Sequence, residues 1–426
     1  MFRFTFFAAI ALTFALADWG APSSAHAQAN DKAQPLGLDE AVRQALAASD
    51  PSVARFAERS AALAERAVSD SQLPDPMARV GVMSLPTDSF SFTQEGMTQL
   101  QFGVAQAFPR GRTLSLTRDK REAERRGELA MLEARELEIV LETRSAWLEL
   151  FYWRQAREKV RASRKAVSDL AEIVSAIFGT GRSTSQDVLR TELELSILDD
   201  RLVDVDRQAE LARADLARYI GNLEAARPLP AILPILAAPA PREVIEAKLV
   251  QHPSVAVEDA TIDARERDID IARQQYKPGW AVEGGYGLRA ATGAPDLVSL
   301  GVSLDVPLFT AKRQDRNLAA ARREKQAARL DRQTRLLEMQ QKLERAYADW
   351  LRQDERIDLY KKIVVARARH TSDAALAAYR SGVSDFAELI RANLAELDVE
   401  LTLLRLEVDQ TIAQAQLLYL EAEKND

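Results

Sequence analysis

The sequence predicts a mainly α-helical protein with a small β part, in which one structural unit occurs twice along the chain. A pattern of residues returns about 200 positions later, which is the signature of an internal repeat. Each copy is predicted to be a helix, two short strands, a very long helix, a Gly-marked turn and another long helix. Two hairpins per chain are too few strands to close a sheet, so we expect an oligomer.

The repeat rests on three landmarks that have counterparts in the second copy. They are Asp50-Pro51-Ser52-Val53 with His252-Pro253-Ser254-Val255, Pro76 with Pro278, and Phe108-Pro109 with Val306-Pro307. The shift is 253 − 51 = 202 residues before the hairpin and 307 − 109 = 198 after it. The four lost residues fall between Pro86 and Gly96, in the loop of the first hairpin.

Composition narrows the class of protein. The 426 residues are 28% charged and 6% aromatic, as is typical of long packed helices. The net charge is −7 with both signs interleaved, which does not favour nucleic-acid binding. No later stretch is long and apolar enough for a transmembrane helix.

The first residues have the pattern of a cleavable secretory signal at positions 1–27. Arg3 precedes an apolar stretch from Phe4 to Ala17, and Ala25-His26-Ala27 offers small residues at the cleavage site. We expect the first repeat at 28–228, a Pro-rich linker at 229–241 and the second repeat at 242–426. Because the chain has no Cys, we expect neither disulfides nor an acylated-Cys anchor.

Four strands are predicted, at about 77–86, 97–108, 279–290 and 297–306. Their side chains alternate strictly, with Leu100, Phe102 and Val104 against Gln101 and Gly103 in the second strand. One face is apolar, and the other holds Gly, Ala and isolated polar groups, which suits a water-filled lumen. The lumen candidates are Arg79, Gln101, Glu283, Arg289 and Asp305.

Strand length and alternation together favour a barrel in a bilayer over a half-buried soluble sheet. Each run is about the length that a tilted strand needs to cross a membrane. Open edges in hydrocarbon would leave backbone groups unpaired, at several kcal/mol each. Three copies of the chain would supply twelve strands.

Long helices are predicted at about 111–178, 185–220, 311–380 and 385–423, with no internal Pro. The two longest run unbroken for on the order of 100 Å. The last helix carries two apolar stripes, one through Leu397, Leu401 and Leu404, the other through Leu403 and Leu406. Two stripes imply two neighbouring helices, as in a cylinder of helices.

This order of elements, twice over, resembles the TolC family of outer membrane channel proteins over essentially the whole mature chain. The residues that carry the resemblance are the strand starts Pro76 and Pro278, the hairpin exits AQAFPRGR (105–112) and LDVPLFTAKR (304–313), and the tips GTGRSTSQDVL (179–189) and YRSGVSDFAEL (379–389). The first hairpin further resembles members that serve heavy-metal exporters of the RND type.

The resemblance implies a homotrimer in the bacterial outer membrane, with a twelve-stranded barrel continuous with a twelve-helix periplasmic tunnel. Such a protein would passively conduct substrates that it receives from an inner-membrane RND-type pump and a periplasmic adaptor protein. Heavy-metal cations are the candidate substrates. An outlet of a type I secretion system would share the fold. A periplasmic adaptor is the alternative from another class, but it would lack the phase-matched strand pairs.

No catalytic constellation, cofactor motif or metal-ligand spacing is found, so we do not expect an enzyme. His252 precedes Pro253 at a helix start, where a capping role is favoured over metal binding. Met77, Met83 and Met97 could suggest contact with a soft metal, but core or lipid contact is the favoured interpretation.

The two helix tips hold the candidate gate residues. Asp187 and Glu388 match across the repeat, each six positions beyond a turn glycine, Gly181 or Gly382. By resemblance, Tyr379, Ser384 and Glu388 occupy positions that close the periplasmic entrance of related channels. Arg391 stands where some members have an acidic residue, which argues against a second acidic ring. The alternative is that these are ordinary solvated tip charges.

Overall fold

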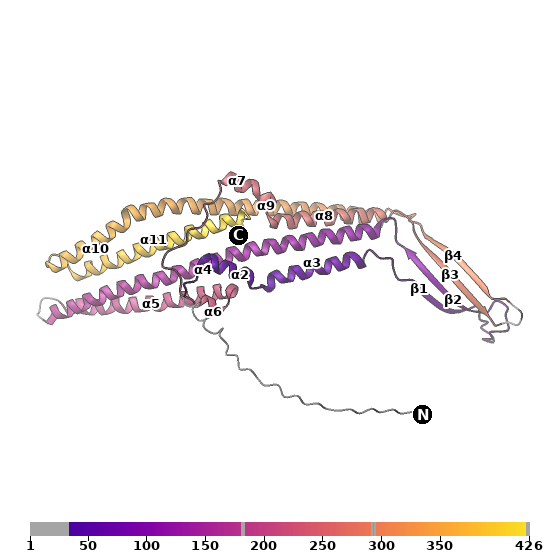
Figure 1. Ribbon diagram of the computed structural model, residues 1–426, viewed down its shortest axis with the longest axis horizontal. Helices are drawn as coiled ribbons and strands as arrows, with labels where there is room; N and C mark the ends of the chain where they lie inside the picture. The colour runs from indigo at the N-terminus through magenta and orange to yellow at the C-terminus, as the bar shows by residue number, and fades with distance from the viewer. Residues whose placement is uncertain (1–33, 180–183, 291–292, 294, 423–426) are drawn as a thin grey trace, which may run out of the picture.

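The computed structural model of the chain describes residues 34–179, 184–290, 293 and 295–422. It is elongated, with a layer of helices at one end and a small sheet at the other (Figure 1). The predicted signal at 1–27 and the turn residue Gly181 lie outside the described residues.

The sheet joins the two repeats through its central strands. Its four strands are β1 (Met77–Met83), β2 (Gln99–Phe108), β3 (Gly279–Arg289) and β4 (Leu297–Asp305), antiparallel in the order β1-β2-β3-β4. The ladder between β2 and β3 runs from Gln99 opposite Arg289 to Phe108 opposite Trp280. The outer edges of β1 and β4 have no partner strand within the described chain.

The first strand is shorter than the expected 77–86. It ends at Met83 because Ser84 takes a left-handed conformation, with φ of +57°. A residue in this conformation cannot continue an extended ladder. Because the residue is Ser, the sequence does not indicate that the strand ends here.

The helices of the first repeat are α2 (Leu38–Ala47), α3 (Pro51–Ser69), α4 (Thr113–Gly179), α5 (Ser185–Ile220) and the short α6 (Asn222–Ala225). Those of the second repeat are α7 (Arg242–Lys248), a 3-10 turn (Leu249–Gln251), α8 (Pro253–Gln274), α9 (Gln314–Leu359), α10 (Val365–Arg380) and α11 (Phe386–Leu420). None of the helices that the structure describes is long and apolar enough to span a membrane.

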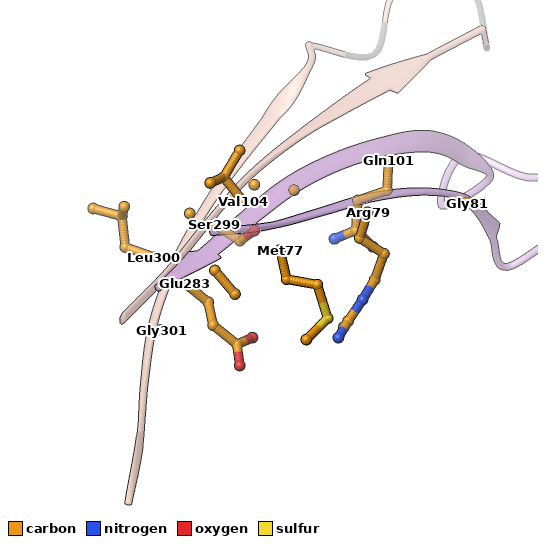
Figure 2. A pocket seen from close by; sticks show the side chains of 13 residues that line it. Met77, Arg79, Gly81, Gln101, Val104, Glu283, Ser299, Leu300 and Gly301 are labelled. Atoms are coloured by element: carbon orange, nitrogen blue, oxygen red, sulfur yellow. The ribbon is translucent and has the colours of Figure 1, made fainter. Parts of the chain in front are cut away.

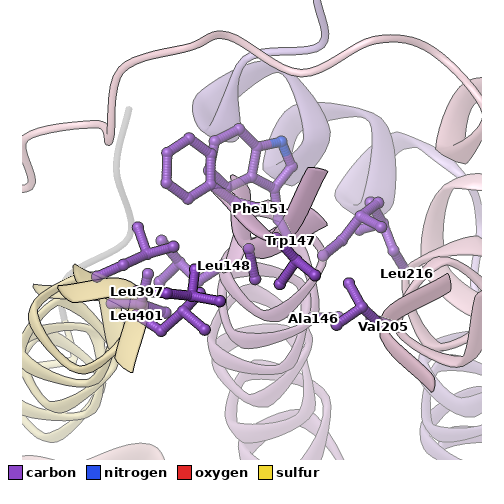
Figure 3. Packing of buried hydrophobic residues seen from close by; sticks show 14 of the residues in the cluster. Ala146, Trp147, Leu148, Phe151, Val205, Leu216, Leu397 and Leu401 are labelled. Carbon is purple, nitrogen blue, oxygen red and sulfur yellow. The ribbon is translucent and has the colours of Figure 1, made fainter. Parts of the chain in front are cut away.

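The long helices form four columns in one layer. Helix α4 packs against α3 and α5 on one side and against α8 and α11 on the other, and α9 packs against α8 and α11. Figure 3 shows the centre of this layer, where Trp147 and Leu148 of α4 lie between Leu397 of α11 and Leu216 of α5. The column of α3 and α5 and the column of α9 and α10 are therefore the two open edges.

Helix α11 has two apolar stripes that face two neighbours, as the sequence predicts. Leu397, Leu401 and Leu404 belong to the core shared with α4. Leu417 and Leu420 pack in a second cluster with Leu343 and other residues of α9. Burying both stripes fixes α11 between the two long helices.

The helix expected over 311–380 is helical throughout from Gln314 to Arg380, but it is not a regular α-helix. A π-helical turn at Tyr360–Val364 lies between α9 and α10. A π turn adds a residue to the helical repeat and so shifts the faces of the two helices relative to each other. Neither Pro nor Gly marks the place in the sequence, which is why pattern analysis did not detect it.

Two joints connect helices end to end within the columns. At the first, Asp50 caps α3 by accepting the N–H of Ser52 at 2.7 Å and also binds Arg218 of α5 at 2.9 Å. At the second, Nδ1 of His252 caps α8 by accepting the N–H of Ser254 at 3.2 Å, and Nε2 lies 3.1 Å from the carbonyl oxygen of Tyr419 in α11. The capping role predicted for His252 is confirmed.

The segment between the repeats crosses the middle of the helical layer without helix or strand from Ala226 to Pro241. Its start is held by Arg227, a buried residue that donates to Glu40 at 2.6 Å and to Glu224 at 2.9 Å. Further along, Gln414 of α11 donates to the carbonyl oxygen of Ala237 at 2.6 Å.

The buried joint at His252 predicts a loss of stability in mild acid. Burial lowers the pKa of His252 below its ordinary value, so the unfolded chain binds the proton more readily. The contribution of His252 to the free energy of unfolding is therefore fully present above about pH 6.5. It is lost as the pH falls from the ordinary pKa of histidine toward the lowered pKa of the folded protein. Protonation also removes the acceptor at Nδ1, and losing a cap costs about 1 kcal/mol.

The measurement is the thermal unfolding midpoint of the purified protein, followed by circular dichroism over this pH range. His252→Asn keeps a capping acceptor that does not titrate and should remove the pH dependence. Asp50 should not contribute there: although its burial acts to raise the pKa, hydrogen bonds from Ser52 and Arg218 lower it to about 2. A midpoint that falls equally in wild type and His252→Asn would contradict the prediction.

Candidate functional site

The sheet has two chemically different faces. Residues that pair across the ladders point to the same side, so the register assigns Val80, Phe102, Tyr286 and Val298 to one face. That face is apolar along all four strands except at Gln106 near the end of β2, and it is exposed to solvent in the single chain, with Leu300 85% accessible. An apolar face of this size that is left uncovered marks a surface that meets lipid or protein.

The opposite face carries all five lumen candidates. Arg79 lies opposite Gly103, Gln101 opposite Gly287, and Glu283 opposite Ala105 and Gly301. Figure 2 shows Arg79 and Glu283 on one side of the strands and Val104 and Leu300 on the other. Arg79, Gln101 and Glu283 line one pocket, together with the backbone of glycines 103, 285 and 301.

The remaining two lumen candidates lie at opposite ends of the same face. The guanidinium of Arg289 donates to the carbonyl oxygens of Gly96 and Pro295 and so connects the two hairpin loops. The carboxylate of Asp305 forms an ion pair with Arg110, at the end nearest the helices. Both residues therefore have a structural role in addition to any contribution to a lumen.

The methionines of the first hairpin require a correction. Met77 and Met83 lie on the polar face of β1, in phase with Arg79, so the expectation of core or lipid contact is wrong for both. Both side chains are largely exposed, and Met97 is exposed in the loop. Their residue type favours core or lipid contact, but the period-two phase of the strand places both on the side of Arg79.

The tip between α10 and α11 is a tight turn stabilised by aromatic packing. Gly382 has φ of +75°, a conformation that favours glycine. Ser384 lies two residues further on, immediately before Asp385, the N-cap of α11. Tyr379 packs edge to face against Phe386, with ring centroids 5.5 Å apart. The Asp385 carboxylate accepts the N–H of Glu388 at 2.9 Å.

Two further tip candidates are brought together on α11. Arg391 forms an ion pair with Glu388, and both side chains are more than half exposed. Neither can be regarded as an isolated charge, because each carries a compensating partner one helical turn away.

Asp187 has a different environment at the tip between α4 and α5. It completes a capping box with Thr184, accepting from the backbone N–H of Thr184 at 3.0 Å and from its hydroxyl at 2.8 Å. This motif satisfies the free donors at the start of α5. Asp187 and Glu388 are thus equivalent in sequence position but not in their contacts.

Several residues that organise these sites were not identified from the sequence. Arg110 binds both Asp305 and, at 2.8 Å, the carbonyl oxygen of Gln275, and Phe108 stacks on Trp280 with ring centroids 4.1 Å apart. The expected hairpins could have suggested the stack, since both residues lie at the helix-side ends of the two central strands. Among the residues the structure describes, no group of three His, Asp or Glu side chains is arranged to hold a metal ion.

Comparison with known proteins agrees with this geometry. Residues 244–420 match the family model described as outer membrane efflux protein. A search of curated proteins by sequence found no match.

Solved structures match over nearly the whole chain. A membrane protein from Pseudomonas aeruginosa matches with a TM-score of 0.79 at 16% identity, covering 92% of this chain and 91% of its own. The CmeC outer membrane channel of Campylobacter jejuni matches at 0.77 and 12% identity, covering 97% and 94%. The outer membrane protein VceC of Vibrio cholerae matches at 0.75 and 17% identity, covering 90% and 96%.

The second repeat therefore matches the family of outer membrane efflux proteins, and the fold of the whole chain, over both repeats, is that of these outer membrane channels.

Proposed function

We propose that three copies of this chain form a passive export duct through the outer membrane and the periplasm. The observation that carries the proposal is a sheet with one exposed apolar face, one polar face and two open edges, connected to a helical layer that is also open at both edges. Three copies would close twelve strands into a barrel with lipid outside and water inside. The helical layers would continue the barrel as a tunnel.

The partners follow from the family resemblance. A duct of this kind would receive its substrates from an inner-membrane RND-type pump through a periplasmic adaptor protein, and the helix tips at Asp187, Tyr379 and Glu388 would form the entrance. Two related channels are likewise described as outer membrane proteins, CmeC and VceC. The duct has no catalytic role in this proposal.

The repeat predicts the register between neighbouring chains. If β4 pairs with β1 of the next copy as β2 pairs with β3, the pair Gln106 and Val282 corresponds to Leu304 and Val80 of the neighbour. Because the chain has no Cys, the double variant Leu304→Cys with Val80→Cys should form disulfides between chains and give a cross-linked trimer on denaturing gels.

The matched control replaces Leu300 and Val80. Leu300 lies on the same face of β4 but four residues away, which is about 13 Å along the strand. This pair should give no cross-link. Equal cross-linking of both pairs, or dimers alone, would contradict the proposed assembly.

The two faces of β4 should tolerate charge differently. Val302→Arg places a cation on the apolar face, and at the bilayer midplane this costs about 2–4 kcal/mol. Ser303→Arg places the same charge on the polar face and should be tolerated. The measurement is the amount of heat-resistant trimer recovered from outer membranes, and recovery of Val302→Arg at or above the level of Ser303→Arg would contradict the assignment of the faces.

The tip pair should control the response of the duct to divalent cations. We expect reconstituted protein to give a passive current in planar bilayers. Arg391→Gln leaves Glu388 without its ion-pair partner, so divalent cations should block this current at about two- to fivefold lower concentration, the range given by an exposed pair. Glu388→Gln with Arg391→Gln should reverse the change, whereas identical block in all variants would leave the pair as solvated charges.

We propose metal cations as the substrates, on the basis of the resemblance of the first hairpin to partners of heavy-metal exporters. Deletion of the gene should then lower survival on copper, zinc, cobalt or nickel salts, and the intact gene should restore it. Sensitivity confined to organic drugs would refute the metal assignment and retain the duct.

A further inference from the structure

An exposed apolar segment continues from the last strand toward the helices. Val306, Leu308 and Phe309 follow β4 and are 54%, 75% and 90% accessible. Val306 keeps the phase of Leu304, which belongs to the apolar face of the sheet. The apolar surface therefore extends past the end of the ladder into the connection to α9.

Five exposed cations lie on the connections between strands and helices at this end of the sheet. They are Arg112, Lys277, Lys312, Arg313 and Arg316, and none has an ion pair within the part of the chain that the structure describes. We call this set the junction cations. Gly111, with φ of +53°, allows the chain to turn so closely that the side chain of Lys277 lies against it.

The junction cations come from separate segments that Arg110 holds together. Its side chain binds Asp305 at the end of β4 and the carbonyl oxygen of Gln275 just past α8. Arg112 follows Arg110 by two residues, Lys277 follows Gln275 by two, and Lys312 to Arg316 follow β4. In Figure 1 these connections lie together where the helical layer meets the sheet.

Few of the acidic groups nearby can offset these charges. Asp305 is paired with Arg110, and Asp70 is paired with Arg121 at 2.8 Å. Asp315 accepts a hydrogen bond from Tyr276 at 2.5 Å and keeps its negative charge, and no ion pair is seen for Asp75 or Asp119 in the part of the chain that the structure describes. The five junction cations outnumber these three carboxylates, so an excess of positive charge remains at the surface next to the apolar segment.

The position of this charge relative to a bilayer follows from the aromatic pair. Phe108 and Trp280 stack on the apolar face at the end of the sheet nearest the helices. Aromatic side chains in such proteins lie at the boundary between hydrocarbon and headgroups. The junction cations, only a few residues further along, then lie at the level of the phosphates.

We propose that the junction cations bind the headgroups of anionic phospholipids in the periplasmic leaflet of the outer membrane. The inference rests on the proposed function, since it requires the sheet to span that membrane. Leu308 and Phe309 enter the edge of the hydrocarbon, and Lys312, Arg313 and Arg316 contact the phosphates of the same lipids. Binding there holds the strand-to-helix connections at a fixed depth.

The test compares lipid binding by the detergent-purified trimer, titrated with phosphatidylglycerol or with phosphatidylcholine of the same acyl chains and followed by native mass spectrometry. Wild type should bind phosphatidylglycerol roughly tenfold or more tightly, given the contribution of each Lys or Arg near an anionic surface. Lys312→Gln, Arg313→Gln and Arg316→Gln together should abolish the preference.

The matched control removes equal charge far from the junction, by Arg190→Gln, Arg356→Gln and Arg367→Gln. These arginines are exposed and have no ion pair among the described residues. The control should keep the preference for phosphatidylglycerol. A preference lost equally in both triple variants would overturn the proposal, as would displacement of phosphatidylglycerol from wild type by inorganic phosphate alone.

Current through planar bilayers separates this inference from the proposed duct. If wild type conducts but binds both lipids equally, the headgroup site is overturned and the duct remains. If wild type prefers phosphatidylglycerol but carries no current, the headgroup site is supported and the duct is contradicted.

Discussion

The ladder between β2 and β3 determines how the rest of the molecule is arranged. It joins the two repeats side by side, so that α4 of the first repeat lies against α8 and α11 of the second. Because the repeats pack side by side, one open edge of the molecule belongs to the first repeat and the other to the second. The second-repeat edge of one copy can therefore pack against the first-repeat edge of another copy in the same way. A head-to-tail contact of this type closes a ring when the rotation permits.

The two end-to-end joints satisfy one backbone requirement by different chemistry. Each helix that starts at a joint has free N–H groups, which a side-chain acceptor must satisfy. Asp50 does this as a carboxylate that also binds Arg218, whereas His252 does it as a buried neutral ring that also contacts the carbonyl oxygen of Tyr419. Both repeats keep the geometry of the joint, but the two joints are expected to respond to pH in different ranges, that of His252 in mild acid and that of Asp50 only in stronger acid.

The sequence predicts features that depend on periodic patterns and misses those that depend on single contacts. Alternation of side chains identified both faces of the sheet, and the two stripes of α11 identified its two neighbours, because burial acts on every turn of a regular element. The early end of β1 at Ser84, the π turn at Tyr360–Val364 and the ion pair of Arg110 depend on local geometry that no repeated pattern records. The site at the tips shows the same division. The turn at Gly382 was predictable from its glycine, but the capping box of Asp187 and the pairing of Glu388 depend on single contacts that the sequence does not record.

A mismatch of spacing explains why the chain concentrates Pro, Gly and charge where the sheet meets the helices. Neighbouring strands lie about 4.8 Å apart, whereas packed helices need about 8–10 Å between their axes. Four strands that continue into four columns must therefore spread apart over a few residues. Pro76, Pro109, Pro278 and Pro307 stand at the four connections, where they end the ladders and fix the direction of the backbone. Because the spreading leaves backbone and apolar side chains uncovered at this level, the cations and aromatic rings of the junction lie where an interface with headgroups would cover them.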